Sequence, residues 1–453
     1  MKAKTILRCV MILSVALFMG LTSTASSAQK QLENLPDTTV RVSVSSSGEQ
    51  GNSDSFTTSI TADGRYVAFA SSASNLVSED TNEVYDVFMH DMQTGMTERV
   101  SLSSTGEQGN GQSFEPSISA DGRYVAFYSD ASNLVSGDTN GFTDIFVHDR
   151  QTGETIRASV SSTGEQADGL SGVPSISADG RSVAFYSEAS NLVSGDTNGY
   201  LDVFVHDMQT GETSRVSVSS IGEQADNNST QPSISADGRY VAFQSQATNL
   251  VNEDTNGAID VFVYDCETAE TQRVSVSTIG EQGNEWSVEP SIAADGRYVA
   301  FMSTASNLVS GDTNATWDVF VHDLQTGETT RISLSSAGEQ GNGYSQFPSI
   351  SANGRFIAFV SGATNLVPGD TNGVQDAFLY DRQNSENMRI SVSSGGEQGN
   401  DVSQLPAISE DGLYVAYNSL ATNLVGDDTN GAWDIFVYYS LGVFTTMLPI
   451  ISR

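Results

Sequence analysis

A triplet of oxygen-bearing side chains recurs seven times in this chain. Each copy has Asp at its first position, Asn at its third and Asp at its seventh, and Gly is common at its fourth. Carboxylate and amide oxygens are hard ligands, so this spacing in a turn suits Ca²⁺. The candidate metal ligands are Asp80, Asn82 and Asp86; Asp138, Asn140 and Asp144; Asp196, Asn198 and Asp202; Asp254, Asn256 and Asp260; Asp312, Asn314 and Asp318; Asp370, Asn372 and Asp376; Asp428, Asn430 and Asp434.

Two interpretations of the triplet are open. If the turn holds calcium, its two carboxylates predict a modest dissociation constant, on the order of 10⁻⁴ to 10⁻³ M. Asp149 does not complete an EF-hand loop with Asp138, because a strand would carry it roughly 16 Å beyond Asp144. In the second interpretation, Asp and Asn make Asx turns that start the next strand without any ion.

Aromatic residues appear in some copies of two positions that vary among the repeats, two residues apart and shortly before a recurring Pro. Large aromatic side chains of this kind bind peptides or sugars at protein surfaces, although exposed variable positions are as often unselected. We take three of them, near the expected channel mouth, as candidate ligand-binding residues: Phe114, Trp286 and Tyr344.

The histidines do not predict a catalytic or zinc site. At the same repeat position other copies carry Tyr, so the position requires an amphipathic ring with a polar tip. No nucleophile elbow, zinc-protease motif or phosphate loop occurs, so we expect no catalytic residues and no cofactor other than Ca²⁺. The histidines are His90, His148, His206 and His322, and the aligned tyrosines are Tyr264, Tyr380 and Tyr438.

A strict repeat of 58 residues positions these side chains. An Asp-Gly or Asn-Gly pair returns at this interval from Asp63 to Asp411, and seven copies fill the chain from about Thr39 to Tyr439. In the second copy, Pro116–Ser119, Arg123–Ser129, Asp144–Asp149 and Arg157–Ser161 are predicted to be strands, rich in Val, Ile, Phe and Tyr.

We therefore predict an all-β fold, a seven-bladed β-propeller with four-stranded antiparallel blades. The competing open β-solenoid normally has shorter repeats and distinct capping repeats, which are not found. The N-terminal strand, expected at Arg41–Ser45, should complete the last blade and thereby remove an exposed sheet edge.

Length and composition predict an exported protein. Lys2, Lys4 and Arg8 precede an apolar run, so we predict a signal peptide over residues 1–28, the propeller over 29–439 and an apolar tail over 440–453. The location is then extracytoplasmic, with no transmembrane segment in the mature chain.

The formal charge of −36 excludes nucleic acid as a partner, and we expect a monomer.

The repeat resembles that of TolB-like propellers. The resemblance lies in the pattern Pro-Ser-Ile-Ser-Ala-Asp-Gly-Arg-Tyr-Val-Ala-Phe at residues 116–127 and 232–243, and it recurs through almost all of the expected mature chain. It implies that this segment forms the two inner strands of a blade, with extracytoplasmic residence and a role in protein contacts. The six blades and the extra α/β domain of TolB have no counterpart here, so its partners are not implied.

Antiparallel blades place two kinds of long loop on the same rim. In the second copy these are residues 129–143, between the second and third strands, and residues 104–115, which connect the blades. We call this surface the long-loop rim. Because recognition residues concentrate on long loops, we expect a non-enzymatic binding or scaffold protein that presents this rim to a protein or glycan. The alternative is a polysaccharide lyase or glycoside hydrolase that uses the channel.

Overall fold

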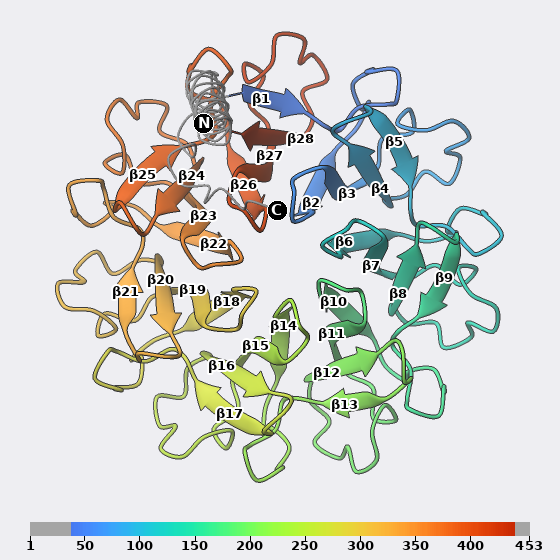
Figure 1. Ribbon diagram of the computed structural model, residues 1–453, viewed down its shortest axis with the longest axis horizontal. Helices are drawn as coiled ribbons and strands as arrows, with labels where there is room; N and C mark the ends of the chain where they lie inside the picture. The colour runs from blue at the N-terminus through green and yellow to red at the C-terminus, as the bar shows by residue number, and fades with distance from the viewer. Residues whose placement is uncertain (1–37, 440–453) are drawn as a thin grey trace, which may run out of the picture. The chain divides into compact units, whose positions relative to one another are not determined.

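Seven four-stranded antiparallel sheets are arranged in a ring (Figure 1). The computed structural model describes residues 38–439, of which 39–438 form one compact unit. The seven-bladed β-propeller is confirmed. The predicted signal peptide and tail lie outside the described residues. Within residues 38–439, no helix is long and apolar enough to cross a bilayer.

The innermost strand of each blade borders the central channel. In the second blade it covers Ser113–Ile118 and therefore starts three residues before the predicted Pro116. The innermost strands are β2 (Ser55–Ile60), β6 (Ser113–Ile118), β10 (Ser171–Ile176), β14 (Ser229–Ile234), β18 (Ser287–Ile292), β22 (Ser345–Ile350) and β26 (Ser403–Ile408).

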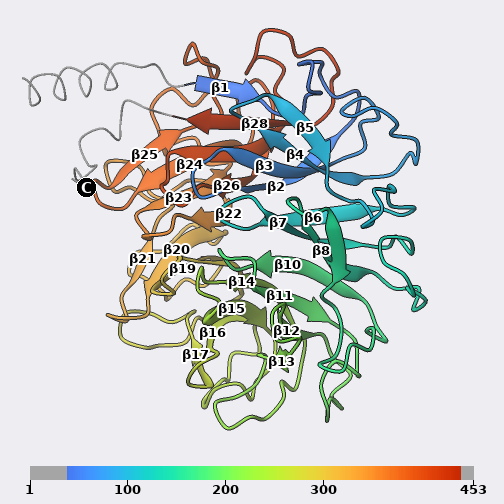
Figure 2. The same ribbon diagram turned by 45° about the vertical axis from the view of Figure 1, so that its right-hand side comes forward.

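The second strand of each blade is largely buried on both faces. Its sequence, YVAFYS in the second blade, lacks the alternation of a strand with one solvated face, because a neighbouring blade covers each side (Figure 2). These strands are β3 (Tyr66–Ser71), β7 (Tyr124–Ser129), β11 (Ser182–Ser187), β15 (Tyr240–Ser245), β19 (Tyr298–Ser303), β23 (Phe356–Ser361) and β27 (Tyr414–Ser419).

The third strand begins at the last Asp of each triplet. Asp144 opens this strand in the second blade, and the ring of Phe146 lies tilted against that of Phe127 of the second strand, with 6.0 Å between ring centroids. The third strands are β4 (Asp86–Asp91), β8 (Asp144–Asp149), β12 (Asp202–Asp207), β16 (Asp260–Asp265), β20 (Asp318–Asp323), β24 (Asp376–Asp381) and β28 (Asp434–Tyr439).

The outer strand lies earlier than predicted. It covers Glu154–Arg157 in the second blade instead of Arg157–Ser161. The segment after Arg157 leaves the sheet and makes a small hairpin in which Val160 pairs with Gln166. The outer strands are β5 (Met96–Arg99), β9 (Glu154–Arg157), β13 (Thr213–Arg215), β17 (Glu270–Arg273), β21 (Thr329–Arg331), β25 (Glu386–Arg389) and β1 (Thr38–Arg41).

The ring is closed by the N-terminal strand, as expected. Strand β1 joins the last blade in the order β1-β28-β27-β26, although it covers Thr38–Arg41 and not Arg41–Ser45. Beyond the strand, the Val42 amide donates to the Ile435 carbonyl at 2.8 Å. The last blade is thus built from both ends of the described chain.

The core of the propeller lies between neighbouring blades. One cluster combines Val87 and Val100 of the first blade with Phe127 and Leu134 of the second, all buried. The short turns help to seal this contact. Gly122 has φ of +73° and a Cβ there would lie 2.6 Å from the ring of Tyr66 in the preceding blade, so both the backbone and the packing require Gly.

Candidate functional site

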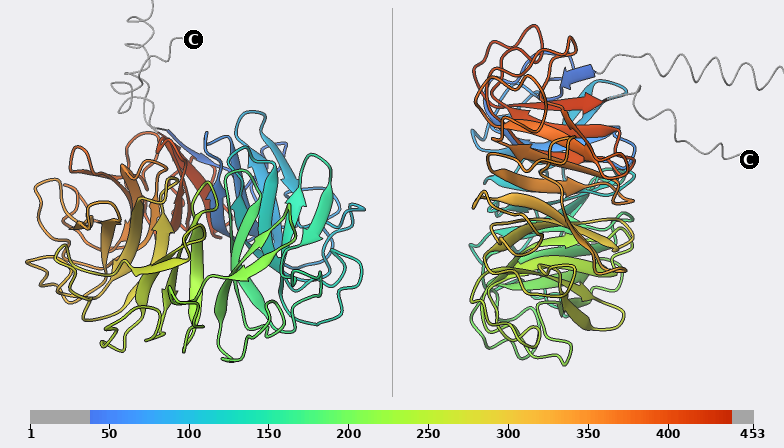
Figure 3. Two further views of the ribbon diagram at one scale, coloured as in Figure 1. Left: turned by 60° about the horizontal axis from the view of Figure 1, so that its bottom comes forward. Right: turned by 90° about the vertical axis from the view of Figure 1, so that its left-hand side faces the viewer.

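The two kinds of long loop are joined to each other by hydrogen bonds. Gln108 Nε2 of an inter-blade connection donates to Thr81 Oγ1 at 2.7 Å, and Asn133 Nδ2 donates to the Gln108 carbonyl at 2.9 Å. These contacts confirm that both loops share one rim. Many strands run along the short axis of the ring, and loops emerge at both of its faces (Figure 3). The recurring Gly-Glu-Gln segment thus braces the rim through its Gln.

The two Asp residues of each triplet lie beside an arginine. In the first blade, Arg99 of strand β5 lies 3.0 Å from Asp80 and 3.5 Å from Asp86. Ser101 Oγ donates to Asp86 Oδ1 at 2.6 Å, and Asn82 Nδ2 donates to Asp86 Oδ2 at 2.9 Å. Both oxygens of the fully buried Asp86 therefore already accept hydrogen bonds from the protein.

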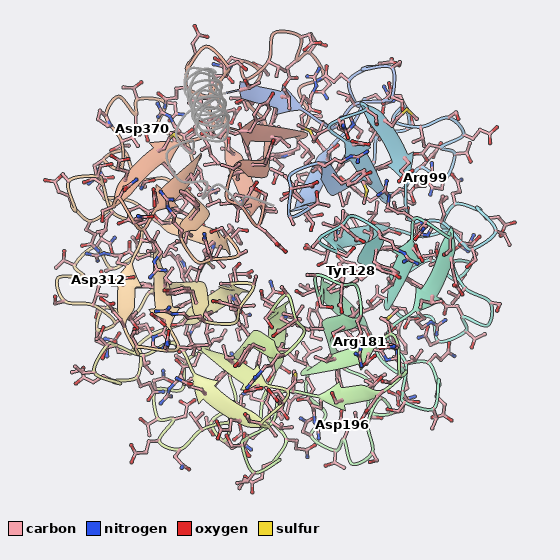
Figure 4. The ribbon with its side chains drawn as sticks, in the orientation of Figure 1. Arg99, Tyr128, Arg181, Asp196, Asp312 and Asp370 are labelled. Carbon is pink, nitrogen blue, oxygen red and sulfur yellow. The ribbon has the colours of Figure 1, made fainter. Side chains whose placement is uncertain are left out.

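The same arginine cluster occurs in every blade. The guanidinium comes from the outer strand each time and lies 3.0 to 3.7 Å from the first Asp of the triplet. Figure 4 places Asp196, Asp312 and Asp370 in the outer part of the ring, far from one another. The arginines are Arg41, Arg99, Arg157, Arg215, Arg273, Arg331 and Arg389.

These contacts fit the ion-free interpretation of the triplet better than a calcium loop. The positive charge between Asp80 and Asp86 is supplied by Arg99, and Asn82 turns its amide nitrogen toward the carboxylate. Its Oδ1 accepts from the Val84 amide, as in an Asx turn. Within residues 38–439, no three His, Cys, Asp or Glu side chains are placed to hold a metal ion. Calcium binding stays a prediction.

The histidines pack inside the blades. Nδ1 of His148 lies 2.8 Å from Thr155 Oγ1 of the outer strand, and His148 pairs with Val125 in the sheet register. Tyr264 occupies the equivalent register position opposite Val241. Burial lowers the pKa of each of the four histidines, which keeps the rings neutral. The structural role predicted from the exchange with Tyr agrees with these contacts.

The three predicted aromatic residues do not form one site. Trp286 and Tyr344 are 51% and 38% exposed at the same position of neighbouring blades, and among the described residues no ring contact joins them. Phe114 is half-buried and lies 4.7 Å from Tyr85 and 5.9 Å from Tyr128, measured between ring centroids.

Phe114 belongs to a line of aromatic rings that crosses three blades. Trp433 lies 5.7 Å from Phe56, Phe56 lies 6.2 Å from Tyr85, and Tyr85 continues to Phe114 and Tyr128. We call these five residues the aromatic arc. Figure 4 shows Tyr128 near the centre of the ring. The arc therefore leads from the long-loop rim toward the channel.

A left-handed residue interrupts every innermost strand. At the residue before the recurring Pro, or before Thr58 in the first blade, φ lies between +45° and +53° although none of these residues is Gly. The pairing register shifts at this point, as in a β-bulge, which redirects the side chain. Such a conformation costs roughly 1–3 kcal/mol per residue. The bulge residues are Thr57, Glu115, Val173, Gln231, Glu289, Phe347 and Leu405.

The bulge residues surround a cavity of about 300 Å³. Six of the seven line it, and only Val173 does not. The recurring prolines, among them Pro116 and Pro290, supply apolar wall. Because the bulge residues differ from blade to blade, this cavity is the chemically asymmetric part of an otherwise repetitive molecule.

Two carboxyl groups and an amide give the cavity its polar side. Gln231 Nε2 donates to both Oε1 and Oε2 of Glu289, at 3.0 Å each. The Glu289 amide donates to Gln244 Oε1 at 3.0 Å, which fixes the bulge between two blades. The Glu115 carboxyl, by contrast, makes no hydrogen bond or ion pair with any described residue.

The electrostatics of the cavity reflect its burial. Burial raises the pKa of Glu115 to about 7, and the neighbouring Glu289 adds to the rise. Burial also raises the pKa of Glu289, against the hydrogen bond from Gln231. Burial and the Glu115 carboxyl raise the pKa of Tyr128 to about 12. A negative charge on Glu115 is therefore costly without a cation beside it.

Sequence reasoning missed Glu115 and Glu289. Strict alternation along the strand would place Phe114 and Pro116 on one face of the blade and Glu115 on the other face, against a neighbouring blade. The bulge instead turns Glu115 toward the channel. The available signal was the residue before the recurring Pro, which is charged in two of the seven copies.

Comparisons with known proteins establish the fold. No protein-family model matches the chain, and no curated protein matches it. An oligogalacturonate lyase in complex with manganese shares 12% identity at a TM-score of 0.54, over 90% of this chain and 97% of that one. The β-propeller domain of the trilobed protease from Pyrococcus furiosus shares 11% at 0.51, over 86% and 98%.

Other matches are partial. The acylaminoacyl peptidase of Pyrococcus horikoshii shares 12% identity at a TM-score of 0.52, over 87% of this chain but only 54% of that one. TolB from Acinetobacter baumannii shares 16% at a TM-score of 0.40, over 74% of this chain and 63% of its own length. At these identities the likeness concerns the propeller fold alone.

Proposed function

Because the chain is a seven-bladed β-propeller, we propose that it is a non-enzymatic binding protein that contacts a protein or glycan through the long-loop rim. We place it outside the cytoplasm, on the basis of the basic and apolar N-terminal segment and of the TolB-like repeat. The braced loops are suited to this role, since a rigid scaffold lowers the entropy lost on binding.

The observation that carries this proposal is the exposed apolar side chains on the long loops. Ile221 and Ile279, at tips of inter-blade connections, are 82% and 80% exposed. Trp286 and Tyr344 add exposed rings on the fifth and sixth blades. Exposed aromatic and aliphatic groups on a polar background are typical of interaction surfaces.

A pair of variants tests the rim. We expect Trp286→Ala combined with Tyr344→Ala to weaken binding at least tenfold to whichever ligand binds in a panel of neutral and acidic oligosaccharides and short peptides. The control combines Gln151→Ala with Gln209→Ala, two exposed residues in the short turns of the opposite rim, and should bind as the wild type does. Equal losses in the two double variants would refute the rim proposal.

A second candidate function is cleavage of a polysaccharide in the channel. It is supported by Glu115 and Glu289, because glycoside hydrolysis employs two carboxyl groups of which one has a raised pKa. The fold shared with an oligogalacturonate lyase adds to it. Sustained turnover of oligogalacturonate or a neutral glycan, with or without Mn²⁺, that Glu115→Gln abolishes would establish this function and reject the non-enzymatic one.

A further inference from the structure

We propose that the channel cavity beside Glu115, Gln231 and Glu289 binds an alkylammonium group, carried by a lysine side chain or by a free alkylamine. The structure places Glu115 in strand β6 and not in the loop predicted over residues 104–115, so this site is distinct from the exposed loop side chains of the proposed function, and the inference goes beyond that function. Four features of the cavity lead to it.

The first feature is an unpaired carboxyl group. Glu115 lines the cavity, and its carboxyl has no hydrogen bond or ion pair among the described residues. No lysine occurs between residues 38 and 439. The arginines of the outer strands are held in the arginine clusters, and those of the short turns, such as Arg123, pair with an Asp at the end of the third strand. A cation that pairs with Glu115 would therefore come from outside the described residues.

The second feature is polar groups without partners in the first and last blades, of which Thr57 lines the cavity and Asn418 does not. The buried Thr57 Oγ1, in the bulge of the first blade, has no hydrogen bond among the described residues. Asn418 is 0% exposed, and neither atom of its amide has a partner there.

Asn418 occupies the repeat position of Gln244, whose side chain caps the Glu289 bulge of the following blade. The bulge that follows Asn418 around the ring is that of Thr57. Buried polar groups normally have partners, so these atoms point to a bound polar group or to water beside the first blade.

The third feature is the kind of group that donates hydrogen bonds to the carboxyl groups. Glu289 receives an N–H group, from Gln231, on both oxygens. No three carboxylate or His groups of the described residues converge as a divalent metal would require. An ammonium group fits these acceptors, because its three N–H donors satisfy separate oxygens around it.

The fourth feature is the apolar wall. Phe347, Leu405 and the prolines of four blades line the rest of the cavity. An alkyl chain gains about 0.8 kcal/mol for each methylene group that it buries. Tyr128 of the aromatic arc is close enough to Glu115 for the carboxyl charge to raise the pKa of its hydroxyl. An ammonium group on an alkyl chain therefore matches both halves of the cavity.

Calorimetry with defined probes tests this site. The two probes are 1,5-diaminopentane, which represents a free amine, and the peptide Gly-Lys-Gly, which represents a lysine side chain. We expect at least one of them to bind, and binding of either one supports the proposal. 1,5-Pentanediol and the peptide with an acetylated lysine lack the amine charge, provided that both peptides are blocked at the N-terminus, and should not bind. Absence of binding in both amine arms at about 10 mM, or equal binding of the uncharged probes, would overturn it.

Two variants locate the binding. Glu115→Gln should weaken amine binding at least tenfold, whereas Glu107→Gln, at an exposed glutamate of an inter-blade loop, should leave it unchanged. We expect the fold to survive Glu115→Gln, since burial disfavours a charge at this position, and the melting curve tests this. The rim double variant should retain amine binding, so failure here and failure of the rim proposal are distinguishable. Unaltered amine affinity in Glu115→Gln would place the amine elsewhere.

The pH dependence gives an independent readout. Glu289, Tyr128 and Tyr186 surround Glu115 electrostatically, and burial raises the pKa of Glu115 to about 7. The amine must replace a proton, so affinity should rise between pH 6 and pH 8 with proton release on binding. Glu115→Gln should lose this rise. A pH-independent affinity in the wild type would contradict the assigned carboxyl group.

Discussion

The hydroxyl of Ser43 donates a hydrogen bond of 2.5 Å to Asp434, a residue 391 positions later in the chain. The same hydroxyl accepts a bond from the Ile435 amide at 3.1 Å. Both contacts are repeated by Ser159 in the second blade, which lies 2.6 Å from Asp144 and 3.0 Å from the Ile145 amide. The same pair of contacts therefore joins the two ends of the described chain at Ser43, whereas at Ser159 it stabilises a blade that is continuous in sequence.

Ser43→Ala and Ser159→Ala separate these two roles. Each substitution removes a hydrogen-bond donor from the equivalent buried Asp of its blade and should lower the free energy of unfolding by about 1–3 kcal/mol. In Ser43→Ala we also expect faster hydrogen exchange at the Val42 amide, because no short turn tethers this segment to strand β28. The matched amide in Ser159→Ala is that of Ala158, and equal exchange at the two amides would contradict a special closing role.

The arginine clusters predict a large stability difference between two arginines. Arg157→Met should cost about 3–5 kcal/mol, because it leaves Asp138 and the fully buried Asp144 without their cation. Arg181→Met is the control, since Arg181 and its partner Asp207 are 47% and 24% exposed and a pair so open to solvent contributes little to stability. Chemical denaturation measures both, and similar losses would show that Arg157 is not the main counter-ion.

Calcium tests the remaining hypothesis for the same loops. With a guanidinium already between the two Asp residues, we expect the melting temperature to be the same in EDTA and in about 10 mM Ca²⁺, a concentration well above the affinity range of a weak loop. A rise of several degrees that Mg²⁺ does not reproduce would establish the ion and require the arginine to move.

The buried histidines predict a loss of stability in mild acid. Burial lowers the pKa of His148 below its ordinary value near 6.5, so the unfolded chain takes up a proton that the folded chain excludes. The free energy of unfolding should therefore fall as the pH drops through about 6.5. In His148→Tyr, which copies the blades that carry Tyr264 and Tyr380, the fall should be smaller, and the two proteins should be closest above pH 7.

A comparison of the two pH profiles isolates this single group. The titration of Glu115 changes stability in the opposite direction. Because its pKa is raised in the folded protein, the free energy of unfolding falls as the pH rises from about 4.5 to 7. That contribution is present in both proteins and cancels in the difference. Identical profiles for wild type and His148→Tyr would mean that His148 is protonated without cost in the folded state.

The repeat predicted the blades because the segments typical of strands and turns recur with the same period. The Asp-Gly turn, the YVAFYS segment and the DIFVHD segment each occur once in 58 residues, which leaves few choices for strand order. The outer strand was misplaced because the residues after Arg157 alternate like a strand, whereas they are buried in the connection to the next blade. Ser159, for example, is fully buried there.

The channel was not predictable from alternation. A bulge that holds Glu115 at a φ of +50° has no marker in the residue type, because Thr, Val, Phe and Leu occupy the same conformation in other blades. The arginine clusters were missed for a different reason. Arg99 and Asp80 are separated by two strands, and only the three-dimensional sheet brings the guanidinium under the loop.

The closing arrangement also sets an order of events. Strand β1 is synthesised first among the described strands, and its partner β28 is synthesised last. The six other blades are each continuous in sequence and can form in succession as the chain emerges, but the seventh must wait for both of its ends. Until then the edges that strands β1 and β28 later present to each other are open to other chains, and the pairing of these two strands covers them.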